Sequence, residues 1–249
     1  MSEATLAAPV VRGGDLAKLW NELRRGGPAH AWEQVVDSLR ARAERRFDAR
    51  HGLDSVAWIP VSDLTVDSPS KAFANIYGPT PAWLMPRFLR SIPEKDLSQF
   101  TFVDFGSGKG RAVLLAARHR FKRVIGLEFS KELHAEATAN IAKFREAGLL
   151  ASPVVESIEA DVLDFDLPDG PLVLYTFNPF GAAVMKPLLE RIAASHRANP
   201  RKIYFVYYDC VDHALVQAAG VFRQLPMRGL NALHRLVMQH AARLYVARN

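Results

Sequence analysis

The order of the apolar segments predicts an α/β protein with a mostly parallel sheet and helices along its flanks. From residue 101 onward, short runs rich in apolar and β-branched residues alternate with longer stretches whose apolar residues recur at helical spacing. Such alternation is typical of parallel sheets, in which each helix connects one strand to the next. Three closely spaced glycines follow the first run and predict a sharp turn from strand to helix.

Two amphipathic helices and a connector are predicted before this α/β part, as an N-terminal helical extension over residues 1–68. The first helix covers residues 15–25 and ends at Gly26-Gly27-Pro28. The second carries apolar residues from Trp32 to Phe47 along one side and ends at Gly52. Residues 54–80 are expected to be irregular, and Pro86 should kink or delay the helix that follows Thr80-Pro81. Residues 69–249 form the predicted second domain.

The remaining elements follow in a regular order. Strands are expected at Thr101–Phe105, Lys122–Phe129, Val154–Ala160, Pro171–Thr176 and Lys202–Tyr208, with two more in the tail at Val221–Leu225 and Arg243–Ala247. Helices are expected at Arg111–Arg118, Lys131–Glu146, Ala182–Arg197 and Asp212–Ala219. Ser130 is the predicted N-cap of the second of these helices. Residues 229–240 fit a helix or a strand equally well.

Composition indicates an ordinary globular chain of 249 residues, with 49% apolar and 23% charged residues. A single cysteine excludes a disulfide within the chain, and no apolar run reaches the length that spans a bilayer. The N-terminus lacks the pattern of a signal peptide, so a cytoplasmic location is expected. Residues 191–249 hold 9 Lys and Arg against 2 Asp and Glu, a basic end that fits either a solvated face or an acidic partner such as nucleic acid.

The glycine loop is the most informative motif. Asp104-Phe105-Gly106-Ser107-Gly108-Lys109-Gly110 has the spacing D-x-G-x-G-x-G, which differs from the G-x-G-x-x-G of dinucleotide-binding folds. The segment resembles motif I of the class I S-adenosyl-L-methionine (SAM)-dependent methyltransferases, without a gap. The resemblance implies a Rossmann-like, seven-stranded sheet whose tail forms an antiparallel hairpin, and SAM as cofactor. It also implies that Asp104, Gly106, Ser107, Gly108 and Gly110 bind that cofactor.

Two later acids extend the resemblance. Glu128 and Phe129 end the second strand about 20 residues beyond the loop, where Rossmann-like folds hold a ribose through a carboxylate. The family places an acid and an apolar residue around adenine where this chain has Asp161-Val162. Glu128 also fits an ordinary acid at the start of a helix, and Asp161 also fits a solvated acidic turn.

Asn178-Pro179-Phe180 follows the fourth strand, at the position of motif IV. It resembles the N/D-P-P-Y/F signature of enzymes that methylate amino or amide nitrogens, with one proline instead of two. The chain thus resembles bacterial-type class I enzymes, and in particular protein-lysine methyltransferases outside the SET class. In these a tyrosine segment before the first strand closes over SAM, which points to Tyr77. Asn178, Phe180 and Tyr77 are the predicted catalytic residues, with Tyr208 as a further wall of the acceptor pocket. Because the family's motif IV faces both methyl donor and acceptor, the resemblance also implies that Asn178 contacts the cofactor.

The predicted function is N-methylation of a protein side chain, with lysine as the favoured acceptor. Methylation of RNA or a small molecule, an NAD(P)-dependent oxidoreductase and a SAM-binding module without catalysis remain alternatives. No tyrosine has a lysine four residues later, which argues against the oxidoreductase. The eight histidines lack paired spacing, so no metal site is expected, and no residue is predicted as a general base. Oligomeric state is not predicted.

Overall fold

The structure is a computed structural model that describes residues 34–56, 58–232, 234, 238 and 240–248. By its internal contacts the chain divides into two units, Met1–Arg46 and Phe47–Asn249. Residues 34–51 are helical, and Gly52, with φ of +63°, ends the helix as predicted. The helix predicted over residues 15–25 lies outside the described residues. The division into functional domains at residue 68 stays a prediction.

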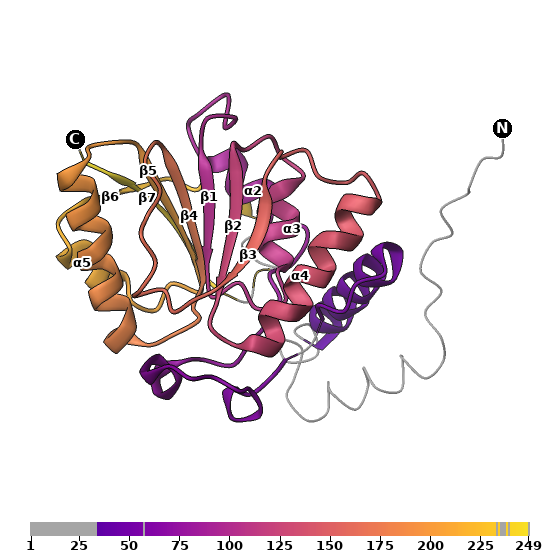
Figure 1. Cartoon of the computed structure of the whole chain (residues 1–249). Helices are drawn as coiled ribbons and strands as arrows, with labels where there is room; N and C mark the ends of the chain where they lie inside the picture. The colour runs from indigo at the N-terminus through magenta and orange to yellow at the C-terminus, as the bar shows by residue number, and fades with distance from the viewer. Residues whose placement is uncertain (1–33, 57, 233, 235–237, 239, 249) are drawn as a thin grey trace. The chain divides into compact units, whose positions relative to one another are not determined.

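A seven-stranded sheet is the centre of the unit from Phe47 to Asn249 (Figure 1). Its strands are β1 (Thr101–Phe105), β2 (Arg123–Glu128), β3 (Val155–Glu159), β4 (Leu172–Phe177), β5 (Ile203–Tyr208), β6 (Phe222–Leu225) and β7 (Ala242–Ala247). They lie in the order β3-β2-β1-β4-β5-β7-β6. Only β7 runs antiparallel to its neighbours, β5 and β6. This is the Rossmann order 3-2-1-4-5-6 with one antiparallel strand inserted, so the predicted Rossmann-like class I methyltransferase fold is confirmed.

Helices cover both faces of this sheet (Figure 1). They are α2 (Met85–Ser91), α3 (Arg111–Ala117), α4 (Lys131–Glu146), α5 (Ala182–Ala198) and α6 (His213–Ala218). Phe102 of β1 and its register partners Val124 and Val173 pack with α2, α3 and α4. The next residue along each strand belongs to the opposite core, with α5 and α6. Because side chains alternate across a strand, these mostly apolar strands are buried on both faces.

The connector contains two short 3-10 helices, η1 (Val61–Asp63) and η2 (Pro69–Phe73). Residues 58–80 are called the strap below. An isolated bridge between Ile59 and Tyr77 closes the strap on itself, and a second bridge, between Ala74 and Phe180, pairs it with the chain after β4. The helix after the strap begins only at Met85, with Pro86 in its first turn, which confirms the expected delay. The strap thus meets the edge where β1, β2 and β4 end.

Candidate functional site

A pocket of about 820 Å³, counted to its open mouth, lies at the carboxyl ends of β1, β2 and β4. This is the edge at which open α/β sheets bind their ligands. Nine of the twelve predicted site residues line it: Tyr77, Asp104, Gly106, Ser107, Glu128, Phe129, Asp161, Val162 and Phe180. The other three, Gly108, Gly110 and Asn178, are not among its lining residues.

The glycine loop leaves β1 with three left-handed residues, since Gly106, Gly108 and Gly110 have φ of 76°, 54° and 80°. Only glycine adopts this conformation without strain. A Cβ at Gly108 would lie 1.9 Å from Cε2 of Tyr77, and one at Gly110 would lie 3.1 Å from Cβ of Ala137 on α4. Gly108 therefore admits the Tyr77 ring, while Gly110 lets α3 approach α4 closely.

The Glu128 carboxylate holds the glycine loop through a hydrogen bond. Its Oε2 accepts the Gly108 N–H at 2.7 Å, and its Oε1 accepts the Ser130 N–H at 2.9 Å. The side chain is only 3% exposed. Burial raises the pKa of Glu128 to about 7, although the hydrogen bonds from backbone N–H groups lower it. An acid that changes charge near neutral pH thus lines the pocket.

Two polar groups beside it belong to the motif itself. Asp104 is buried, and that burial, followed by the charge of Glu128, raises its pKa well above the ordinary value. Ser107 Oγ is buried with no hydrogen-bond partner among the described residues. Because a buried hydroxyl without a partner costs free energy, Ser107 Oγ is available to a bound ligand.

Asp161 and Val162 lie at the far side of the pocket, after β3. Asp161 accepts hydrogen bonds from the Ser68 hydroxyl and, at 2.9 Å, from the Leu163 N–H. Burial alone would raise the pKa of Asp161, but the hydrogen bonds from Ser68, Ser70 and Leu163 bring it below its ordinary value. Asp161 is thus an ionised acid held against the strap, rather than one of a row of solvated acids.

Asn178 follows β4 in the left-handed region, with φ of 40°. Its Nδ2 donates to Oδ2 of Asp209 at 2.9 Å, and its Oδ1 accepts the Tyr207 hydroxyl at 3.4 Å. Phe180, two residues later, is buried in the pocket wall. The structure therefore brings Phe180 to the predicted cofactor residues but engages the Asn178 side chain at the end of β5, next to Tyr208.

Tyr77 covers the loop from the strap. Its hydroxyl donates to the Ser55 carbonyl at 3.0 Å, and burial raises its pKa well above the ordinary value. Thr80, at the end of the strap, shares a 2.8 Å hydrogen bond with the Tyr175 hydroxyl of β4. The strap is thus held to the pocket at more than one point.

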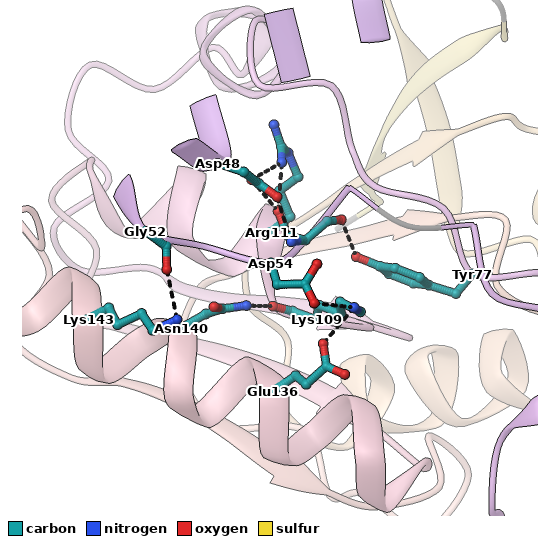
Figure 2. A network of polar contacts seen from close by, with 10 residues as sticks. Asp48, Gly52, Asp54, Tyr77, Lys109, Arg111, Glu136, Asn140 and Lys143 are labelled. Atoms are coloured by element: carbon teal, nitrogen blue, oxygen red, sulfur yellow. Dashed lines mark hydrogen bonds and ion pairs between the residues drawn. The ribbon is translucent and has the colours of Figure 1, made fainter. Parts of the chain in front are cut away.

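The residues around the loop that sequence reasoning missed form a polar network (Figure 2). Arg111, at the start of α3, is 1% exposed and its Nη1 contacts Oδ1 of Asp48 at 2.7 Å. Lys109, inside the motif, forms ion pairs with Glu136 at 2.7 Å and Asp54 at 3.3 Å. These pairs join residues 47–55 to the loop and to α4. In the sequence, only the cations Lys109 and Arg111, within the loop and directly after it, could have pointed to this network.

Among the residues that the structure describes, no group of three or more potential ligands is placed to hold a metal ion. In the same part of the chain, every helix is too short or too polar to cross a bilayer.

Comparison with solved structures finds proteins of similar fold. A predicted N6-adenine-specific DNA methylase from Listeria monocytogenes is 14% identical, with a TM-score of 0.46 and coverage of 69% of this chain and 52% of that one. Magnesium protoporphyrin IX methyltransferase from Synechocystis PCC 6803 is 11% identical, with a TM-score of 0.47 and coverage of 68% and 79%. An RNA methyltransferase from Salinibacter ruber is 21% identical, with a TM-score of 0.43 and coverage of 68% and 92%.

The aligned part of this chain spans only about half of the Listeria protein. No family model matches the chain, and no curated protein matches it in sequence. At these identities the similarity concerns the fold, and the three proteins act on different substrates.

Proposed function

We propose that this protein is a SAM-dependent methyltransferase that methylates a nitrogen, with a protein amine such as a lysine side chain as the favoured acceptor. The observation that carries the proposal is one pocket lined by the glycine loop, the buried acid that ends β2 and a second acid after β3. The motif resemblance predicted these residues as a set, and the fold gathers them at the ligand-binding edge.

The residues present fit this cofactor. Glu128 would accept hydrogen bonds from the two ribose hydroxyls, and Asp161 with Val162 would flank the adenine. Ser107 Oγ is buried and has no hydrogen-bond partner among the described residues, so it would be able to form a hydrogen bond with the cofactor. When bound, SAM supplies an electrophilic methyl group on a sulfonium. The protein's own part is to orient the acceptor and to exclude water, which Tyr77, Phe180 and the strap do by covering the loop.

Calorimetry on the purified protein tests the cofactor. S-Adenosylhomocysteine (SAH) should bind and NADH should not. Glu128→Ala should weaken SAH binding by about 1.5–3 kcal/mol, the range for hydrogen bonds to a charged group. Glu146→Ala, an exposed acid at the end of α4, is the matched control and should leave the affinity unchanged. Heat with NADH and none with SAH would overturn the proposal.

The acceptor is tested separately with SAM labelled in its methyl group. The protein is incubated with a bacterial extract, and label is measured in protein, RNA and small molecules. Acid-stable label in protein, recovered as methyllysine, is the expected result. Label found only in RNA or small molecules would leave the methyltransferase in place and overturn the protein acceptor.

A further inference from the structure

The backbone that follows β4 is hydrogen-bonded to the strap. Asn75 donates its side-chain Nδ2 to the Asn178 carbonyl at 2.9 Å and its N–H to the Pro179 carbonyl at 2.8 Å. Gly181 donates its N–H to the Phe73 carbonyl at 2.8 Å. The carbonyls of Asn178 and Pro179 thus each accept a hydrogen bond from Asn75. The side chains beside this turn are the next groups that can recognise an acceptor.

Asp209 organises the side chains here. It follows β5 in the left-handed region, with φ of 56°, and its carboxylate holds two partners. Oδ2 accepts Nδ2 of Asn178 at 2.9 Å, and Oδ1 lies 3.1 Å from Nδ1 of His240. Donation from the Asn178 amide leaves its carbonyl oxygen as the hydrogen-bond acceptor. Donation from Nδ1 of His240 leaves Nε2 with an unshared pair. The Asp209 carboxylate thus orients two hydrogen-bond acceptors, Oδ1 of Asn178 and Nε2 of His240.

Aromatic rings connect this cluster to the cofactor pocket. The Phe177 and Tyr208 rings lie 4.4 Å apart, and the His240 ring lies 5.5 Å from each of them. Phe177 also lines the pocket, while His240 lines a separate surface groove with Met227, Leu230 and Arg243. The cluster therefore lies between the predicted methyl-donor site and a groove by which a side chain can approach. The side chains of Asp209 and His240 are 26% and 29% exposed.

We propose that His240 is the proton acceptor of the methyl transfer and that Asp209 is the residue that positions it. The proposal rests on the proposed function and assigns the acceptor as a primary amine. Nε2 of His240 takes one proton from the ammonium, and the carbonyl oxygen of Asn178 accepts a second N–H. The freed lone pair forms the N–C bond as the S–C bond of the cofactor breaks. The products are a secondary ammonium and SAH, and the imidazolium returns its proton to water.

Charged and titratable groups of the described residues lie around His240. Asp209 lies after β5, the Tyr208 phenol is on β5, and Arg243 of β7 lines the same groove. Behind Asp209, the Tyr207 hydroxyl is shared between Asn178 and Asp212, at 3.4 Å from each. Among these, Asp209 is the group in direct contact with the imidazole. The tautomer of His240 should accordingly depend on Asp209.

The test uses the full chain saturated with SAH, and n-butylamine as a mimic of a lysine side chain. Nitrogen-proton NMR of the imidazole rings identifies His240 by the signals lost in His240→Gln. The wild type should show the tautomer with Nε2 unprotonated, and n-butylamine should shift these signals in a saturable way. Asp209→Asn should give a mixture of tautomers and bind the amine at least tenfold more weakly. His134→Gln, whose ring contacts Ser157 on β3, is the control and should respond as the wild type does.

Unchanged His240 signals at saturating n-butylamine would overturn the inference, and so would wild-type amine binding by Asp209→Asn. If Asp209→Asn does not fold, His240→Gln decides: it should lose amine binding while it keeps SAH affinity within about twofold, and wild-type amine binding by this variant would overturn the inference. Calorimetry with SAH separates this result from the proposed function. Failure to bind SAH overturns the methyltransferase, whereas SAH binding without an amine response overturns only the role of His240.

Discussion

Lowering the pH from 8 to 6 should weaken SAH binding about tenfold, because the ribose hydroxyls need the ionised form of Glu128. Burial raises the pKa of this carboxyl to about 7. If only the carboxylate binds, the apparent dissociation constant is multiplied by roughly 1 + 10^(7−pH). That factor is about 1.1 at pH 8, about 2 at pH 7 and about 11 at pH 6, and the change corresponds to about 1.4 kcal/mol.

Calorimetry at these pH values, in buffers of different ionisation enthalpy, measures both the affinity and the protons released. About one proton should be released on SAH binding at pH 6 and almost none at pH 8. Glu128→Gln should bind more weakly at pH 8 and lose the slope. Asp104, also raised in pKa by its burial, remains in this variant. A slope that survives in Glu128→Gln, or a flat profile in the wild type, would refute the role of Glu128.

The Glu128 carboxyl also affects the stability of the protein without ligand, and its pKa shift determines whether stability rises or falls with pH. Its folded-state pKa of about 7 lies above its ordinary value of 4.5, so the folded state binds the proton more tightly. The stability from this group is therefore fully present below pH 4.5 and is lost as the pH rises to about 7. Between pH 5 and pH 8 the loss is about 2.5 kcal/mol. Urea unfolding of the wild type, compared with Glu128→Gln at both pH values, should show this difference.

Three further substitutions test other parts of the site. Gly108→Ala should abolish SAH binding, because its Cβ would lie 1.9 Å from the Tyr77 ring; Gly148→Ala, equally left-handed with open space, should bind normally by calorimetry. Asp48→Ala should lower the urea midpoint, with a loss of more than about 1 kcal/mol, because it removes the 2.7 Å ion pair with Arg111 and the two hydrogen bonds that Asp48 accepts from Ser55, and an unchanged midpoint contradicts this. Asn178→Ala should reduce labelled-methyl transfer more than tenfold with SAH affinity within about twofold, and undiminished transfer contradicts its role.

Much of the fold could be predicted because the central strands β1, β2, β4 and β5 are buried on both faces, and because helices connect β1 to β2, β2 to β3 and β4 to β5. β4 is a run of apolar and aromatic residues interrupted only by Thr176, and it ends where Asn178 begins the next turn. Strand ends were less certain, since a strand's first residue pairs or not according to its neighbours. The strap was predicted only as irregular chain, because its two 3-10 helices are three and five residues long and carry no periodicity.

The candidate site divides in the same way. Residues that belong to a contiguous motif, such as Asp104 and Ser107, could be predicted, and the fold places them in one pocket. Contacts between residues that lie far apart in the sequence could not be predicted. Asp48 meets Arg111 across 63 positions, and Asp209 meets Asn178 across 31. No local pattern distinguishes such a pair from two solvated polar side chains, because the contact exists only after the sheet has formed.

The turn after β4 shows why the acceptor could not be taken from the motif alone. The N/D-P-P-Y/F signature has two prolines before the aromatic residue, whereas this chain has only Pro179 between Asn178 and Phe180. The position after it, Gly181, donates its N–H to the strap, and the Pro179 carbonyl accepts from Asn75. The backbone that would hold an acceptor in the signature thus holds the strap instead. Discrimination between amine and other acceptors then falls to Asn178 and its neighbours on β5, which the motif does not include.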